Sequence, residues 1–361
     1  MKATIVITGL GTGGAERFLN KLLPLEGVDV DVVSVTGLDE VGRELEEKVP
    51  VKYLNEGKSF KPLKSFFSLR KHLKKRKPDV VLTFLIHADI FGRITAKMAG
   101  VKKVICCVRN DYSTITKLWL ADKYTKFLVD EYVVNSDSLK SYMDKLKVRN
   151  YKVIPNGVDV EELELKAEKG FKEEINVKDR LITCIARLKE QKDQKTLVEA
   201  MQYLKGCTLA LVGEGEDREK LERLVKELGV EDKVLFPGNR TDIPRILADT
   251  DVFVLPSKVE GMSNSLLEAM ALGKRCVVSD IPQNKTLIKH EENGLTFKTN
   301  NAKDLAKKIT QTKKEHGEKA RKTIKEKYEI GKIRKRYKEL IESGTENLPK
   351  KRRKSIKNKT H

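Results

Sequence analysis

The chain has 361 residues, of which 39% are hydrophobic, and its formal net charge is +20. This length favours two domains, each large enough for its own core, in a soluble globular protein. No apolar run reaches the roughly 18 residues of a membrane span, and the N-terminal segment has no signal-peptide pattern, which indicates a cytoplasmic protein.

Strand-like apolar runs alternate with amphipathic stretches along the whole chain, which predicts an α/β protein with parallel sheets. The expected strands of the first half are 3–8, 30–35, 80–84, 104–108, 131–134 and 151–154. Those of the second half are 181–186, 207–212, 233–236, 251–255, 275–278 and 295–297. Helices are expected between the strands, and a last helical region covers about 318–343.

The turn-rich segment Ile154–Asp159 lies near the middle of the chain and is the expected hinge. We therefore predict two facing doubly wound, Rossmann-like domains with a ligand cleft between their strand ends. We predict an acceptor-side domain at 1–156 and a nucleotide-sugar domain at 157–317. A helical region at 318–344 is predicted to cross back to the first domain, and a basic tail follows at 345–361.

Five cysteines are scattered without the paired spacing of a zinc site. They occupy positions 106, 107, 184, 207 and 276. Because most lie in apolar runs, we expect buried thiols in a reducing compartment and no bound metal.

The C-terminal tail is strongly basic, with Lys350–Lys354, Lys357 and Lys359 and no acid after Glu346. Such a segment is typically disordered and can bind anionic lipid, at about 1 kcal/mol per basic residue close to the surface. Nucleic acid and a purely solubilising role are the alternatives. Aromatic residues make up only 6% of the chain, so stacking platforms for nucleic acid are not expected.

Two glutamates, Glu260 and Glu268, form the most specific motif, in Glu-Gly-Met-Ser-Asn-Ser-Leu-Leu-Glu. They follow a strand-like run and enter an apolar helix, where open α/β sheets bind ligands. Acceptor-only carboxylates beside free helix amides suit a ligand with hydroxyls and phosphate, such as a nucleotide sugar. The alternative is a capping box, in which Ser265 and Glu268 only satisfy the amides of the helix start.

Gly9–Gly14 follows the first strand and matches GxGxxG, which alone would suggest an NAD-dependent oxidoreductase. That fingerprint also needs an acid at the end of the second strand, whereas Asp39 lies past the expected end. We favour a helix start at Gly13, Gly14 and Glu16 whose bare amides face a ligand. A tight turn without a ligand is the alternative.

Two cations, Arg187 and Lys192, flank the loop after the strand at 181–186. Together they can neutralise a diphosphate leaving group without a metal ion. The loop 236–242, which contains Arg240, is predicted to lie on the same rim.

These motifs, in this order, resemble glycosyltransferase family 4, whose members are retaining nucleotide-sugar transferases with the GT-B fold. The resemblance covers the chain to about residue 340. It implies that Arg187 and Lys192 bind the donor diphosphate, that Glu260 contacts the donor sugar, and that Glu268 holds the ribose. It also assigns the sugar and phosphate site to the loop Gly261, Met262, Ser263 and Asn264, with Gly13 and Gly14 approaching the diphosphate or the acceptor.

One feature departs from the family pattern. Many members carry a histidine after the fourth strand of the first domain, where this chain has Arg109 and Asn110. A similar variant occurs in bacterial cell-surface glycan enzymes, so either residue is a candidate replacement, and His87 lies on the predicted rim. The resemblance implies transfer of a hexose or hexosamine to a lipid-linked or cell-surface glycan, with no cofactor and no nucleic acid.

Overall fold

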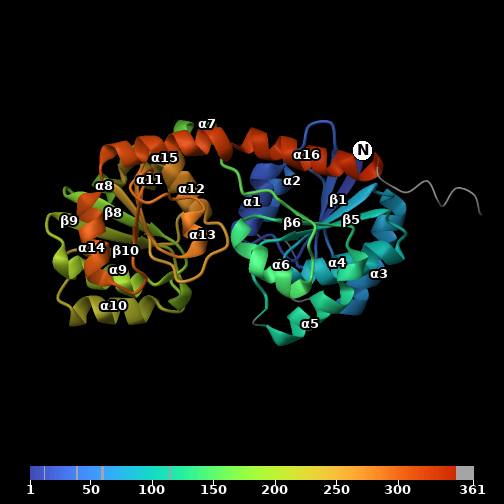
Figure 1. The fold of residues 1–361 in the computed structure, drawn as a ribbon, viewed down its shortest axis with the longest axis horizontal. Helices are drawn as coiled ribbons and strands as arrows, with labels where there is room; N and C mark the ends of the chain where they lie inside the picture. The colour runs from blue at the N-terminus through green and yellow to red at the C-terminus, as the bar shows by residue number, and fades with distance from the viewer. Residues whose placement is uncertain (12, 38–39, 58–60, 114, 347–361) are drawn as a thin grey trace, which may run out of the picture. The chain divides into compact units, whose positions relative to one another are not determined.

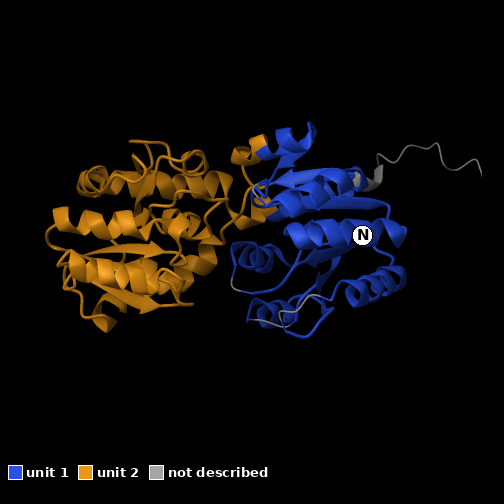
Figure 2. Cartoon of the chain, turned by 90° about the horizontal axis from the view of Figure 1, so that it is seen from below, with its two compact units in different colours: residues 1–134, 142–154, 334–361 blue, residues 135–141, 155–333 orange. Residues whose placement is uncertain are grey.

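The computed structural model describes residues 1–11, 13–37, 40–57, 61–113 and 115–346, and these form two compact units (Figure 2). Of the described residues, unit 1 comprises those of Met1–Val134 and Tyr142–Ile154 and those from Arg334 to Glu346, and unit 2 comprises those of Asn135–Ser141 and Pro155–Ile333. Asp39 and the tail residues 347–361 lie outside the described residues.

Unit 1 is built on a seven-stranded sheet in the order β3-β2-β1-β4-β5-β6-β7, and every pair of neighbours is parallel (Figure 1). The strands are β1 Lys2–Ile7, β2 Asp29–Ser34, β3 Val51–Tyr53, β4 Val80–Phe84, β5 Lys103–Val108, β6 Glu131–Val134 and β7 Tyr151–Val153. The central strands are buried on both faces, which explains their near-continuous apolar sequences.

Helices cover both faces of this sheet, because the chain moves outward from β1 to β3 and then returns to β4 and beyond. The helices are α1 Gly14–Leu22, α2 Glu40–Glu46, α3 Pro62–Arg76, α4 Ile86–Met98, α5 Thr116–Thr125, η1 Lys126–Leu128, η2 Asp137–Leu139 and α6 Lys140–Leu146.

Unit 2 contains a six-stranded sheet in the order β10-β9-β8-β11-β12-β13, again with parallel neighbours throughout. The strands are β8 Arg180–Ile185, β9 Cys207–Val212, β10 Val234–Gly238, β11 Val252–Leu255, β12 Arg275–Ser279 and β13 Leu295–Phe297. Two apolar clusters pack on this sheet, so both of its faces are covered. The predicted doubly wound α/β architecture is confirmed.

The helices of the second half begin with α7 Val160–Leu165 and end with α16, which starts in unit 2 and continues from Arg334 in unit 1. Between them lie α8 Phe171–Glu174, η3 Glu190–Lys192, α9 Gln194–Ala200, η4 Met201–Tyr203, α10 Arg218–Glu227, α11 Ile243–Asp249, α12 Asn264–Ala271, α13 Pro282–Lys285, α14 Ala302–Gln311 and α15 Lys314–Lys327. The bounds of α16 are Ile330–Glu346.

The last helical region, expected at about 318–343, consists of two helices, α15 and α16. The break comes from Val158, whose N–H donates to Tyr328 O at 2.8 Å and whose carbonyl accepts from Ile330 N at 2.9 Å. Space beside it at position 157 is tight, since a Cβ there would approach Ile330 Cδ1 and Ile333 Cγ1 to 2.9 Å. The short edge strand β3, whose residues are half-buried, was also not predicted.

A buried polar cluster lies under α4 in unit 1. Arg93 Nη2 donates to Asp122 Oδ1 at 2.7 Å, and Tyr142 OH donates to Asp122 Oδ2 at 2.5 Å. Asp89, which is 1% exposed, lies in the same cluster. Burial raises the pKa of Asp89 to about 7, with Asp122 raising it further and Arg93 lowering it. The predicted buried thiols are also present, since all five cysteines are free and buried.

Candidate active site

Glu260 lies in the loop between β11 and α12, at the carboxyl end of a central strand. Its Oε1 accepts from Lys192 Nζ at 2.5 Å and from Ser257 Oγ at 2.7 Å. The Glu260 side chain is only 7% exposed. Among the described residues, both of these hydrogen bonds fall on Oε1, so one carboxylate oxygen is anchored and Oε2 is available to accept from a ligand hydroxyl.

Ser257, which anchors Glu260, is itself held by residues at the end of the neighbouring strand β12. Ser279, at the end of β12, donates its Oγ to Ser257 O at 2.5 Å, and Asn284 Nδ2 donates to Ser279 Oγ at 2.9 Å. All three of these residues are buried. Buried polar groups that are hydrogen-bonded specify one geometry. This chain of contacts therefore fixes the start of the loop between β11 and α12, which we call the acid loop.

Asn156 holds the far end of the same loop. Its Nδ2 donates to Met262 O at 3.3 Å and to Asn264 Oδ1 at 2.9 Å, and the side chain is buried. The sequence predicts a hinge at Ile154–Asp159 but does not predict this contact of Asn156. A signal was present, because an asparagine within an otherwise apolar and turn-forming segment needs hydrogen-bond partners once it is buried.

Glu268 lies in the second turn of α12 and is half-buried. The helix is capped by Ser263, whose Oγ accepts from Leu266 N at 3.3 Å. A capping box needs its glutamate three residues after the cap, and that position is Leu266. The alternative with Ser265 and Glu268 as a capping box is therefore wrong, and the cap lies two residues earlier. Gly261, Met262, Ser263 and Asn264 form the loop and the first residue of the helix, and all are half-buried.

The loop after β8 carries both predicted cations. Arg187 is exposed, and Lys192 ends the short helix η3 with its side chain 19% exposed. This loop is fixed against the loop after β9, because Leu188 N donates to Glu214 O at 3.0 Å. Gly213 has φ +140, and a Cβ there would overlap the backbone carbonyl of Ala186. Only glycine permits this close approach.

Cys184 lies on β8 and is buried. Burial raises the pKa of this thiol to about 12, while Lys192 lowers it and Glu260 raises it. The sulfur therefore stays a thiol at neutral pH and packs as an apolar side chain.

Arg240, predicted to bind the donor, makes other contacts in this structure. Its Nε donates to Asp242 Oδ1 at 2.8 Å and its Nη1 donates to Glu174 Oε1 at 2.6 Å. Hydrogen bonds to these two carboxylates raise the pKa of Arg240. The guanidinium also lies 5.6 Å from the ring centre of Phe171. The structure does not bring Arg240 into contact with the acid loop.

The candidates of unit 1 follow three neighbouring strands. Gly13 precedes α1 and Gly14 begins it after β1, and the Glu16 carboxylate lies beside Gly13. His87 is exposed in the first turn of α4 after β4, and Asn110 is exposed after β5. Strands β1, β4 and β5 are adjacent in the sheet, so their carboxyl ends meet at one edge.

Arg109 differs from its neighbour Asn110 because it is buried. Its Nη2 donates to Tyr337 OH at 2.6 Å, and its guanidinium lies 4.3 Å from the ring centre of Phe18 and 5.0 Å from that of Phe84. These contacts bind α16 to the sheet of unit 1 and enclose the cation. Of the two candidates that could replace the family histidine, only Asn110 presents its side chain to solvent.

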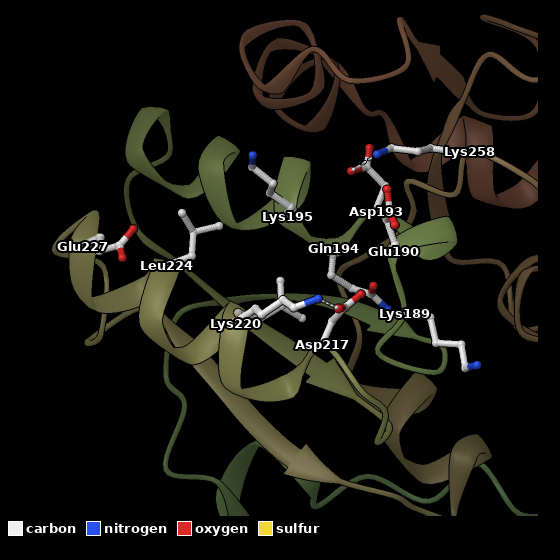
Figure 3. Close-up of a pocket in the computed structure, with 11 residues that line it drawn as sticks. Lys189, Glu190, Asp193, Gln194, Lys195, Asp217, Lys220, Leu224, Glu227 and Lys258 are labelled. Carbon is white, nitrogen blue, oxygen red and sulfur yellow. Dashed lines mark hydrogen bonds and ion pairs between the residues drawn. The ribbon is translucent and has the colours of Figure 1, made fainter.

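A cavity of about 380 Å³ lies beside the turn after β8, between α9 and α10. Its rim includes Lys258 and Asp193, whose side chains approach to 3.5 Å, and Lys220 and Asp217, which pair at 2.8 Å (Figure 3). Neither Lys192 nor Glu260 lines this cavity. Four of its charged residues already pair with one another in these two contacts, and we assign the cavity no ligand.

Within the described residues there is no group of three or more His, Cys, Asp or Glu side chains placed to hold a metal ion. In the same part of the chain, no helix combines the length and the apolar character needed to cross a bilayer.

Comparison with known proteins identifies the family. The model described as "Glycosyl transferases group 1" matches residues 166–330, and the model described as "Glycosyltransferase Family 4" matches residues 12–162. The chain belongs to glycosyltransferase family 4. The predicted nucleotide-sugar-dependent hexosyltransferase is thereby confirmed, and the oxidoreductase alternative for Gly9–Gly14 loses its support.

Two relatives and one solved structure illustrate the similarity. The Escherichia coli UDP-Gal:alpha-D-GlcNAc-diphosphoundecaprenol alpha-1,3-galactosyltransferase is 35% identical over 264 residues, 66% of this glycosyltransferase and 67% of that protein. The Campylobacter jejuni N-acetylgalactosamine-N,N'-diacetylbacillosaminyl-diphospho-undecaprenol 4-alpha-N-acetylgalactosaminyltransferase is 28% identical over 329 residues, 84% and 88% of the two chains. The structure of Anabaena HepE in complex with UDP-glucose has a TM-score of 0.83 and 20% identity, and it covers 95% of this chain and all of that one. The predicted GT-B fold is confirmed.

Proposed function

We propose that this glycosyltransferase moves a hexose or hexosamine from a uridine diphosphate sugar to a hydroxyl of a lipid-linked glycan, with retention at the anomeric carbon. The observation that carries the proposal is the Lys192–Glu260 pair at the carboxyl ends of β8 and β11. Family membership and relatives named for diphosphoundecaprenol-linked acceptors support the choice of donor and acceptor.

The Lys192–Glu260 pair divides the work of binding the donor. Glu260 keeps Oε1 on its protein partners and accepts from donor-sugar hydroxyls through Oε2. Lys192 uses one ammonium hydrogen on Glu260, which leaves two for the oxygens of the diphosphate. Arg187, exposed on the same loop, adds a second positive charge, and Glu268 accepts from the ribose hydroxyls.

The reaction needs little more than charge stabilisation and orientation. The acceptor oxygen bonds to the anomeric carbon as the bond from that carbon to the diphosphate oxygen breaks. The acceptor proton passes to the leaving diphosphate, so no separate base is required. Lys192 and Arg187 stabilise the negative charge that develops on the leaving group. The amides of Gly261, Met262, Ser263 and Asn264 line the phosphate and sugar site.

The acceptor side belongs to unit 1 in this proposal. Asn110 and His87 follow adjacent strands and are exposed, and they join the helix start at Gly13, Gly14 and Glu16. We propose that transfer needs no metal ion, and that the enzyme works at the cytoplasmic side of the membrane with its basic tail, 345–361, on anionic lipid.

A panel of nucleotide sugars tests the reaction, with a diphosphoundecaprenol-linked glycan as acceptor and with or without chelator. We expect transfer from one uridine diphosphate sugar, unaffected by chelator and lowered at least about a hundredfold by Lys192→Ala, because a charge on the leaving group is then lost. The matched control is Lys195→Ala, an exposed lysine on the next helix. Loss of transfer on chelation would contradict the assignment of charge neutralisation to Arg187 and Lys192.

A further inference from the structure

Helix α3 has an unusual outer surface for a helix of a water-soluble protein. Its inner side buries Leu69 and Leu73 against the sheet, yet Leu63 and Phe67 on the opposite side are 78% and 64% exposed. Leu63 and Phe67 are four residues apart and therefore share one face. Every charged residue of this helix that is exposed is a lysine: Lys64, Lys71, Lys74 and Lys75. The sequence has no acid between Glu56 and Asp79.

The segment formed by α5 and η1 repeats this character. Leu120, Tyr124 and Phe127 recur at a spacing of four and three residues, and Tyr124 and Phe127 are 69% and 78% exposed. Lys117 and Lys123 are exposed beside them. The one acid of the helix, Asp122, is buried in the polar cluster with Arg93 and contributes nothing to the surface.

Both segments lie on the same side of the unit 1 sheet. The connections from β3 to β4, from β4 to β5 and from β5 to β6 all advance in one direction, so right-handed crossovers put α3, α4 and α5 on one face. Helix α4 packs against both of the others, and Figure 1 shows the three grouped together at one side of the unit. Arg70 Nε on α3 donates to Met98 O at 3.5 Å, which places exposed Met98 beside α3.

We propose that this surface docks unit 1 on an anionic lipid membrane. We define the docking face by its exposed apolar residues Leu63, Phe67, Met98, Leu120, Tyr124 and Phe127 and its exposed lysines 64, 71, 74, 117 and 123. Exposed apolar groups of this number mark an interaction surface, and lysines in excess over exposed acids match negatively charged headgroups. Phenyl and phenol rings reach the boundary between headgroups and acyl chains.

The docking face is distinct from the basic tail, since all of its residues belong to the folded unit 1. The docking proposal depends on the proposed function in one respect only: docking would bring the transferase to a lipid-linked acceptor. Binding to vesicles is measured without transfer, so the two proposals can fail separately.

The test is co-sedimentation of the full-length protein with phosphatidylcholine vesicles that contain or lack phosphatidylglycerol. The test variant is Phe67→Ser/Phe127→Ser, and the matched control is Leu165→Ser/Tyr203→Ser, which changes two exposed apolar residues of unit 2. A variant that ends at Glu346 lacks the basic tail and shows how much the tail contributes to vesicle binding. Transfer to a water-soluble acceptor is assayed in parallel to show that each variant is folded and active.

We expect binding only with phosphatidylglycerol, and a partition coefficient lowered at least about tenfold in the test variant, since two aromatic anchors are removed. The control should bind as the wild type does, and the test variant should still act on a soluble acceptor. Equal binding of test variant and wild type, or no binding of the wild type, overturns the proposal. So does a wild-type protein that self-associates through this face while the test variant stays monomeric, because the occupant is then a second copy.

Discussion

Ser257 gives the most decisive test of the candidate site, because its hydroxyl is buried and donates to the Glu260 carboxylate. Its Oγ donates to Glu260 Oε1 at 2.7 Å, and the serine is fully buried. In Ser257→Ala the carboxylate loses one of its two anchors and gains rotational freedom. We therefore expect slower transfer in a protein that still folds.

The magnitude follows from the contacts. A hydrogen bond to a charged group contributes about 1.5–3 kcal/mol, and about 1.4 kcal/mol corresponds to a factor of ten in rate. Lys192 still holds the same oxygen at 2.5 Å, so the lower end of the range applies. We expect kcat/KM for the donor to fall about tenfold in Ser257→Ala.

The assay is steady-state transfer with varied donor, in four variants. Glu260→Ala and the double variant Ser257→Ala/Glu260→Ala complete a mutant cycle, in which the effect of Ser257→Ala should vanish once Glu260 is absent. Ser65→Ala is the control, since Ser65 is equally buried and accepts from Asn55 Nδ2 at 2.7 Å in unit 1. It should lower stability but leave kcat/KM within about twofold of wild type.

Two outcomes would refute the reasoning. If Ser257→Ala keeps wild-type kcat/KM, Glu260 does not need its anchor. If Ser257→Ala slows the Glu260→Ala enzyme as strongly as the wild type, the serine acts by another route than the carboxylate.

Four further predictions concern other parts of the molecule. Gly213→Ala should lower the free energy of unfolding by about 2 kcal/mol or more and weaken donor binding. Gly206 has a positive φ but open space around it, so Gly206→Ala should lower the free energy of unfolding by only about 1 kcal/mol. Thermal unfolding measures the stability of both variants, and donor titration measures their binding. Asn156→Ala removes two hydrogen bonds to the acid loop and should raise KM for the donor about tenfold with kcat less affected, and an unchanged KM contradicts the positioning role. Glu268→Gln should weaken donor binding about tenfold in titration calorimetry, and unchanged affinity rules out the ribose contact. Burial raises the pKa of Asp89 from 3.8 to about 7. Its contribution to the free energy of unfolding, at most about 4 kcal/mol, is therefore fully present below about pH 4 and lost as the pH rises through 7. Urea unfolding at several pH values should show that Asp89→Asn flattens this dependence.

The sequence by itself determined the fold class and the place of the acid loop. Buried parallel strands need apolar residues on both faces, so runs such as Val80–Phe84 and Val252–Leu255 are visible without any partner. The glutamates after β11 and the cations after β8 are then placed by the rule that parallel strands end at the same edge. These features depend on local pattern and on strand direction, and both can be derived from the order of residues.

The tertiary structure decided which of these groups meet. The break between α15 and α16 depends on hydrogen bonds from Val158, which is distant in sequence. The anchoring of Glu260 likewise depends on the adjacency of β8, β11 and β12, and the capping of α12 on the turn that Ser263 adopts. Arg109 is buried whereas its chain neighbour Asn110 is exposed. Arg109 is enclosed by Phe18, Phe84 and Tyr337, which come together only in the folded unit. Hydrogen bonds and burial between distant segments follow from packing, which no local pattern encodes.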